Sequence, residues 1–226
     1  GRKGTAYLGR EMTEMRNLLL LFLLMTSPIL AEGLKVGDTV PDFTLINQNG
    51  ESVSLKKFRG KVVLVTFLYT TCPFPEKCPT ISKKLGQTRK LIESVTEGTD
   101  KLQVISITID PEHDTPEALK AYSRGMDRDV ANWTFLTGPP ATVAKVASQF
   151  GVLYWDEKGV LEHNMRTAVI GQDGKLEILL QGSDWKAGQL AAGSLVPSRD
   201  STTAIKPMIR FIVILRIFAS MPCRQT

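Results

Sequence analysis

Apolar and polar positions alternate along the chain in two periods, which predict strands separated by helices. Residues 61–69 (KVVLVTFLY) and 102–110 (LQVISITID) are near-continuous β-branched and aromatic runs. Runs of this kind are typical of strands buried on both faces of a sheet. A shorter run at 133–138 (WTFLTG) predicts a third strand. The buried part of the fold is therefore expected to be a sheet.

Helices are predicted between these strands. In residues 79–95 the apolar side chains recur at helical spacing, at Ile81, Leu85, Leu91, Ile92 and Val95. The segment 114–126 begins with an Asp or Thr cap and has Pro116 near its first helical position. The segment 139–151 ends at a glycine, and 183–195 predicts a closing helix.

Two hairpins complete the pattern. Residues 43–55 turn at Asn49-Gly50, and residues 166–182 turn at Asp173-Gly174. Strands that alternate with helices form a parallel core sheet, and the last hairpin adds an antiparallel edge. The predicted fold class is α/β, with a mixed central sheet flanked by helices and an N-terminal β-hairpin.

Both ends of the chain differ from this pattern. A charged stretch precedes an apolar run at residues 18–30, and Ala31 follows it, which is the pattern of a secretory signal. An uncleaved membrane anchor is the alternative, and residues 1–11 read as upstream sequence. We therefore expect an exported protein whose domain spans residues 32–196. Residues 197–226 form a tail of unknown status that contains Cys223.

Composition supports one folded domain. Of 226 residues, 42% are apolar and 23% are charged, which are ordinary globular values. The net charge of +5 is mild, and no run of Lys and Arg alternates with aromatic residues. Composition and charge therefore argue against nucleic-acid binding.

The candidate chemistry lies in the segment TTCPFPEKCP, directly after the run at 61–69. Cys72 and Cys78 are separated by five residues, which is too wide for a C-x-x-C redox motif. Open α/β sheets bind ligands at the carboxyl ends of their strands. In an oxidising compartment two nearby thiols either form a disulfide or are kept reduced for a purpose. The residues alone leave a disulfide, a peroxidatic nucleophile and a metal site open.

Several longer segments are more specific. The segments VPDFTLINQNGESVSLKKFRGKVVLVTFLYTTCP, ISITIDPEHDTPEALKAY, NWTFLTG and HNMRTAVIGQDGKL together resemble the Sco/SenC family. The resemblance implies a thioredoxin-like fold and a chaperone that delivers copper to, or maintains the thiols of, the copper centre of cytochrome c oxidase. Thiol–disulfide oxidoreductase activity stays open. The resemblance also implies Cu(I) or Cu(II) bound by Cys72, Cys78 and His163. The implied partner is the copper-bearing oxidase subunit, with other copper carriers or thiol reductases as further partners. The implied location of the protein is the periplasm, either free or anchored to the membrane and facing the periplasm.

The chemistry of these residues agrees with copper. Soft thiolates select Cu(I), and an imidazole suits both oxidation states. The start of the helix after Cys78 is expected to lower the thiol pKa. One departure stands out, because the family's commonest loop has three residues between its cysteines. Of the neighbouring residues, we expect His113 to be solvated and Asp110 and Asp114 to cap a helix, with Asp110 alternatively supporting the metal ligands.

Two other classes share this fold. A thiol–disulfide oxidoreductase usually carries C-x-x-C and a cis-proline before the facing strand, whereas the facing segment 161–170 here has His163 and no proline. A non-catalytic thioredoxin-like binding module is the other alternative. A peroxiredoxin would need Thr or Ser three residues before its nucleophile, and position 69 is tyrosine.

Overall fold

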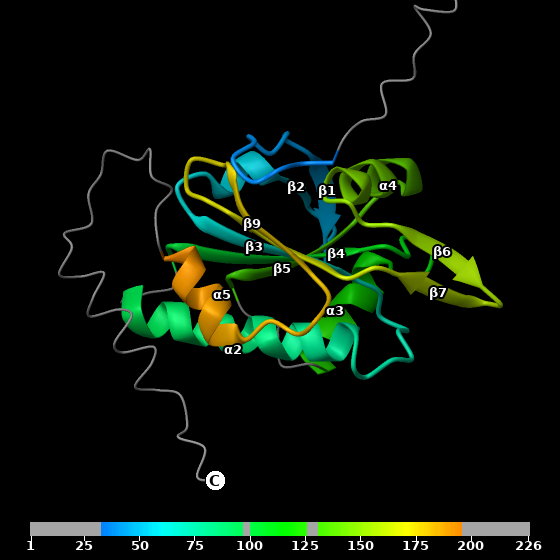
Figure 1. Ribbon diagram of the computed structural model, residues 1–226. Helices are drawn as coiled ribbons and strands as arrows, with labels where there is room; N and C mark the ends of the chain where they lie inside the picture. The colour runs from blue at the N-terminus through cyan, green and yellow to red at the C-terminus, as the bar shows by residue number, and fades with distance from the viewer. Residues whose placement is uncertain (1–32, 97–99, 126–130, 196–226) are drawn as a thin grey trace, which may run out of the picture. The chain divides into compact units, whose positions relative to one another are not determined.

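The computed structural model describes residues 33–96, 100–125 and 131–195 (Figure 1). Its main element is a seven-stranded sheet with the strand order β2-β1-β5-β4-β3-β8-β9. The strands of this sheet are β1 (Thr44–Asn47), β2 (Ser52–Ser54), β3 (Val62–Leu68), β4 (Leu102–Thr108), β5 (Trp133–Thr137), β8 (Arg166–Ile170) and β9 (Leu176–Gln181). A separate two-stranded sheet joins β6 (Tyr154–Glu157) to β7 (Val160–His163).

The centre of the sheet is parallel, as the apolar runs predict. β3 pairs with β4 from Val62↔Leu102 to Leu68↔Thr108, and β4 pairs with β5 in the same direction. All seven residues of β4 are buried. The register places the carboxyl ends of β3 and β4 side by side, so the loops that follow them lie next to each other.

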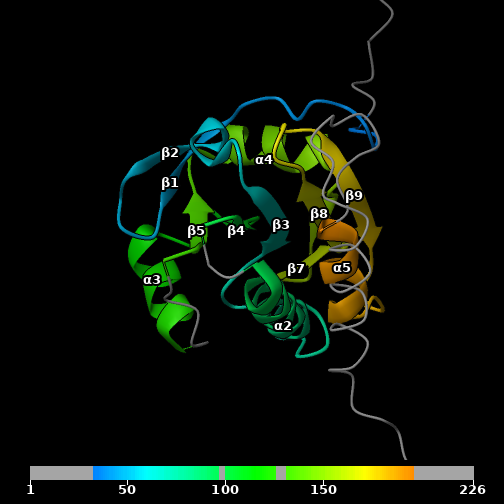
Figure 2. The same cartoon turned by 90° about the vertical axis from the view of Figure 1, so that its left-hand side faces the viewer.

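Helices cover both faces of the sheet. They are the short 3-10 helix η1 (Leu55–Phe58), α2 (Cys78–Thr96), α3 (Pro116–Gly125), α4 (Pro140–Gln149) and α5 (Ala187–Ser194). Helices α2, α3 and α5 lie on one face, and α4 lies on the other (Figures 1 and 2). The layered α/β architecture is thioredoxin-like, as expected.

Helix α2 is held by a buried apolar stripe. Ile81, Leu85 and Ile92 recur at helical spacing and are each at most 2% exposed. Burying a side chain of this size stabilises the fold by about 1.5–3 kcal/mol. The stripe fixes the helix on the sheet, and therefore fixes its first residue, Cys78.

The two predicted hairpins are present. β1 pairs with β2 and β8 pairs with β9, both antiparallel. Gly50 and Gly174 have φ angles of +79° and +80°, which residues with a Cβ rarely adopt. β8 also pairs with β3, so the second hairpin extends the sheet on the β3 side.

The β6–β7 hairpin is a finding that the hydrophobic pattern does not predict. It turns at Lys158-Gly159, whose φ angles are +55° and +82°, as a two-residue hairpin turn with both residues left-handed requires. The register pairs Tyr154 with His163. His163 is thus the last residue of a strand outside the main sheet.

The end segments of the chain lie outside the described residues. This concerns the leader and upstream sequence at residues 1–31 and the tail at 197–226 with Cys223. Within residues 33–96, 100–125 and 131–195, no helix is both long enough and apolar enough to cross a bilayer.

Candidate metal site

Two thiols and one imidazole come from three neighbouring elements. Cys72 lies in the loop after β3, Cys78 is the first residue of α2, and His163 is the last residue of β7. Cys78 and His163 are buried, whereas Cys72 is partly exposed, and both cysteines are free thiols. The Cys78 Sγ lies 3.6 Å from the His163 Nε2. The structure therefore brings Cys78 and His163 together, on the same side of the fold as Cys72.

The orientation of the imidazole is set by its own neighbour. His163 Nδ1 lies 2.8 Å from the carbonyl oxygen of Asn164. A carbonyl only accepts, so Nδ1 donates its proton, and the lone pair of Nε2 is directed at Cys78. The ring of Tyr69 packs edge-on against the imidazole, at 6.0 Å between centroids. Nε2 is thus available as a metal ligand.

The imidazole is also kept neutral. Burial lowers the pKa of His163, and the positive charge of Lys77 acts in the same direction. A metal ligand must be the deprotonated imidazole, because the proton and the metal compete for one lone pair. The site therefore does not have to release a proton from His163 when it binds a metal near pH 7.

The two sulfurs have opposite acidities. A hydrogen bond from the Cys78 thiol stabilises the Cys72 thiolate and lowers the pKa of Cys72 to about 6. Donation of that hydrogen bond to Cys72, together with burial, raises the pKa of Cys78 far above its usual range. The expected lowering of the thiol pKa by the helix start is therefore wrong for Cys78, although that residue begins α2. For Cys72 the pKa falls, and the largest cause is the neighbouring thiol.

The five-residue loop is folded as a turn. Lys77 N donates to Phe74 O at 3.0 Å, and Thr80 Oγ1 donates to Pro75 O at 2.9 Å. Cys72 Sγ lies 3.8 Å from Phe74 O. In the part of the chain that the structure describes, no group of three or more His, Cys, Asp or Glu side chains is arranged to hold a metal ion. Cys72 would have to turn away from Phe74 to join Cys78 and His163 on one ion.

Asp114 has a role that the sequence did not indicate. Its buried carboxylate accepts from Thr70 N at 3.1 Å, from Thr70 Oγ1 and from Thr108 Oγ1 at 2.6 Å. Burial raises the pKa of this carboxyl. Thr115 rather than Asp114 supports the start of α3, because Thr115 Oγ1 accepts from Ala118 N at 3.3 Å. The expectation that Asp114 caps the helix is therefore wrong, and it instead anchors the loop that leads to Cys72.

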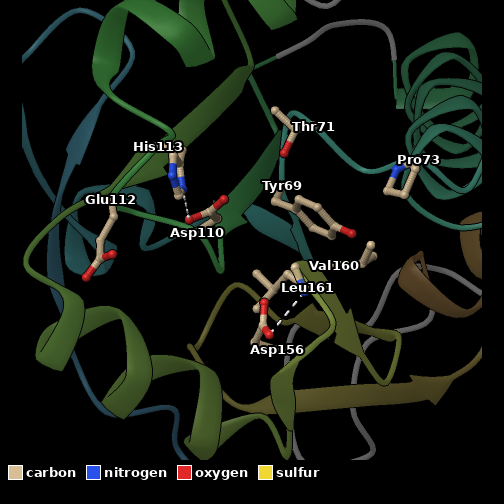
Figure 3. A pocket seen from close by; sticks show the side chains of 10 residues that line it. Tyr69, Thr71, Pro73, Asp110, Glu112, His113, Asp156, Val160 and Leu161 are labelled. Carbon is tan, nitrogen blue, oxygen red and sulfur yellow. Dashed lines mark hydrogen bonds and ion pairs between the residues drawn. The ribbon is translucent and has the colours of Figure 1, made fainter.

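Asp110 also faces a different partner from the one expected. Its Oδ1 lies 2.8 Å from Nδ1 of His113, whose side chain is largely exposed, as predicted. Figure 3 shows this pair across from Tyr69, on the wall of a pocket of about 580 Å³. Thr71 and Pro73 line the same pocket, so it opens beside the loop that carries Cys72.

A thioredoxin-like fold with two free thiols and a neutral histidine at one edge defines a class of proteins that bind soft metals or exchange disulfides. Within that class the assignment is specific, because the family model described as SCO1/SenC matches residues 32–194. The chain belongs to the SCO1/SenC family.

Individual relatives agree with this assignment. A SCO2-like protein of Rickettsia typhi is 32% identical over 154 residues, which are 65% of this chain and 70% of that protein. The structure of Bradyrhizobium japonicum ScoI with copper bound is 28% identical, with a TM-score of 0.58 over 70% of this chain and 98% of the other. BsSco, described with a disulfide switch as a member of the Sco family of cytochrome c oxidase assembly proteins, shares the fold at 24% identity. Its TM-score is 0.61, over 74% of this chain and all of that one.

Proposed function

We propose that this protein binds copper through Cys72, Cys78 and His163 and delivers it to the copper-bearing subunit of cytochrome c oxidase. The observation that carries the proposal is the 3.6 Å contact between Cys78 Sγ and a His163 Nε2 whose lone pair is free. The copper-bound ScoI relative supports the choice of metal. The description of the Sco family as oxidase assembly proteins supports the choice of partner.

The donor set suits copper in both oxidation states. Two thiolates favour Cu(I), and the imidazole allows Cu(II) to be held as well. Cys72 is already a thiolate near neutral pH, because its pKa is lowered to about 6. Cys78 would lose its proton when the metal arrives, since a metal displaces the proton of a coordinating thiol. Copper loading should therefore release about one proton from Cys78.

Transfer of copper is a ligand exchange. Cys72 is partly exposed on a loop, whereas Cys78 and His163 are buried on a helix and a strand. A thiolate of the partner can therefore approach from the Cys72 side and add to the metal before a ligand of this protein departs. The buried pair would release the metal last. Apart from the metal–ligand bonds, the exchange changes only the protonation of Cys78.

Thiol–disulfide exchange with the same oxidase subunit is a second candidate, and the unequal acidities of the two thiols favour it. The Cys72 thiolate would attack a disulfide of the partner and release one partner sulfur as a thiolate. Cys78 would then attack the mixed disulfide, lose its proton and release the second sulfur. Two electrons pass to the partner, and a Cys72–Cys78 disulfide remains.

The leader pattern at residues 18–31 supports an exported location. We propose that the protein acts in the periplasm, either free or anchored by this segment. Other copper carriers or thiol reductases would then reload or reduce it.

Cu(I) titration of the reduced protein tests the metal proposal. We expect His163→Ala and Cys78→Ser each to weaken Cu(I) binding by at least tenfold, measured by competition with a chelator. His113→Ala is the matched control, because it removes the other histidine of the chain and should leave the affinity unchanged. Equal affinity of the parent and His163→Ala proteins would rule out the three-ligand site and show that His163 is not a copper ligand.

A further inference from the structure

An ion pair lies directly beside the contact between Cys78 and His163. Lys77 Nζ is 2.6 Å from Glu162 Oε2. Lys77 precedes Cys78 and Glu162 precedes His163, so the two contacts join consecutive residues of the same two segments. The ion pair therefore connects the start of α2 to β7 one residue away from the candidate ligands.

The same ammonium group also contacts the loop between the two cysteines. Lys77 Nζ lies 4.1 Å from the centre of the Phe74 ring. The carbonyl oxygen of Phe74 in turn lies 3.8 Å from Cys72 Sγ. The Lys77 ammonium group, at the start of α2 beside Cys78, thus contacts both the loop that follows Cys72 and the strand that ends at His163.

The Lys77–Glu162 contact matters because of where β7, the strand that ends at His163, lies in the fold. β7 pairs only with β6 in a two-stranded sheet, and neither strand belongs to the seven-stranded sheet that holds β3 and supports α2. His163 is joined to β8 of the main sheet through Asn164 and Met165, and Asn164 N donates to Leu153 O at 3.1 Å. These backbone links place the end of β7, and the Lys77–Glu162 contact adds a direct side-chain link from β7 to the start of α2.

The Lys77–Glu162 ion pair is more shielded from solvent than a surface pair, so it is expected to contribute more to stability. The side chains of Lys77 and Glu162 are 22% and 25% exposed. By comparison, Lys56 pairs with Asp42 at 3.6 Å with 70% of the lysine side chain exposed. Exposed pairs contribute little, whereas loss of one partner of a largely covered pair leaves an uncompensated charge.

We propose that Phe74, Lys77 and Glu162 form a clamp that holds the five-residue loop and the start of α2 against the strand bearing His163. The clamp sets the separation of Cys78 and His163 and limits the movement of Cys72. It would stabilise a cysteine spacing two residues longer than the commonest loop of the family. Lys77 and Glu162 are positioning residues here, since they act through Cys78 and His163.

The consequence for copper rests on the proposed function, but the clamp itself has a readout that needs no metal. In the reduced, metal-free protein, the ring nitrogens of His163 report the Cys78 contact in long-range 1H–15N NMR spectra. The chain has two histidines, so a His113→Gln spectrum assigns both sets of signals. We expect Lys77→Gln and Glu162→Gln each to shift or broaden the Nε2 signal of His163.

Cu(I) affinity is the second readout. Each single substitution should weaken binding by about tenfold, as loss of a group that orients a metal ligand typically does. The exchanged pair Lys77→Glu/Glu162→Lys should recover part of the affinity and of the His163 signals, because it restores the ion pair but not the contact of the ammonium group with the Phe74 ring. Lys56→Gln, which removes the exposed pair, is the control and should change neither readout.

The outcomes separate the two proposals. The clamp is disproved if Lys77→Gln and Glu162→Gln leave both the His163 signals and the Cu(I) affinity as in the parent. It is also disproved if the exchanged pair is folded but restores none of the His163 signals. If the parent binds no copper while the His163 signals respond as expected, the clamp stands and the metal function fails. Should a single variant unfold, circular dichroism will show it, and the exchanged pair then decides.

Discussion

At the scale of single residues, the unequal acidity of the two thiols makes Cys72 the reactive one. With a pKa of about 6, Cys72 is roughly nine tenths ionised at pH 7. Cys78 stays a thiol, because donation to Cys72 and burial both oppose its ionisation. We expect iodoacetamide to alkylate Cys72 first in the reduced protein, with a rate that rises with pH around a midpoint near 6. Mass spectrometry of proteolytic peptides would follow both sites.

Variants at Cys78 identify the cause of this acidity. Cys78→Ala removes the donor, so the midpoint of Cys72 alkylation should move up toward the ordinary value of about 8.5. Cys78→Ser keeps a hydroxyl donor and should give an intermediate midpoint. A midpoint that stays near 6 in the alanine variant would show that another donor, such as the backbone N–H of Phe74 or the Tyr69 hydroxyl, controls the thiolate.

At the scale of elements, Asp114 ties together the ends of the two central strands. It accepts from Thr108 at the end of β4 and from Thr70, two residues after β3 ends. Asp114→Ala would leave the partly buried Thr70 N–H without an acceptor, which should lower the free energy of unfolding by about 1–3 kcal/mol. Asp114→Asn keeps an acceptor and should cost less. Urea unfolding of both variants at pH 7 tests the order.

The pH dependence of the stability of Asp114→Asn tests whether the Asp114 carboxyl changes its ionisation on folding. Burial raises the folded-state pKa of Asp114 above its unfolded value. Its contribution to stability is therefore complete below the unfolded pKa, about 3.9, and is lost as pH rises through the folded pKa. Asparagine does not titrate, so the stability of Asp114→Asn relative to the parent should improve as the pH rises from about 4 through the raised folded-state pKa of Asp114. A constant difference would mean that Asp114 does not change ionisation on folding.

The same elements show what sequence patterns can and cannot predict. The strands β3, β4 and β5 were predictable because burial on both faces demands continuous apolar runs. The hairpin of β6 and β7 was not, since β6 is four residues long and mostly exposed, so no apolar alternation distinguishes it. Its turn at Lys158-Gly159 was the available signal. Asp114 was misassigned because a carboxylate ahead of Thr-Pro fits a helix start whether it is exposed or buried.

The candidate site was predictable to a different degree. Cys72 and Cys78 follow β3 directly, so their place at the sheet edge follows from strand prediction alone. The link to His163 came only from the family resemblance, because 85 residues separate it from Cys78 and local patterns carry no information over that distance. The pairing of Lys77 with Glu162 spans the same separation, and it required the three-dimensional structure.

At the scale of the whole described fold, a metal at this site would join three elements that are far apart in the chain. Cys72 and Cys78 lie six positions apart, so an unfolded chain could still bind Cu(I) through both sulfurs. His163 comes to Cys78 only when β7 packs beside α2. Copper should therefore stabilise the folded state mainly through the affinity that His163 adds, because a ligand stabilises only by its preference for the folded over the unfolded chain.

Thermal unfolding of the reduced protein measures this preference. A ligand at 100 times its dissociation constant, with no affinity for the unfolded chain, contributes about 2.7 kcal/mol. For a domain of this size that corresponds to a rise in Tm of about 5–10 °C, and binding to unfolded thiols reduces it. We expect Cu(I) to raise the Tm of the parent within this range, and the rise to shrink sharply in His163→Ala. In oxidised protein with a Cys72–Cys78 disulfide the rise should vanish, since both thiolates are consumed. An undiminished rise in His163→Ala would show that copper binds the two sulfurs alone, and that the imidazole is not part of the site.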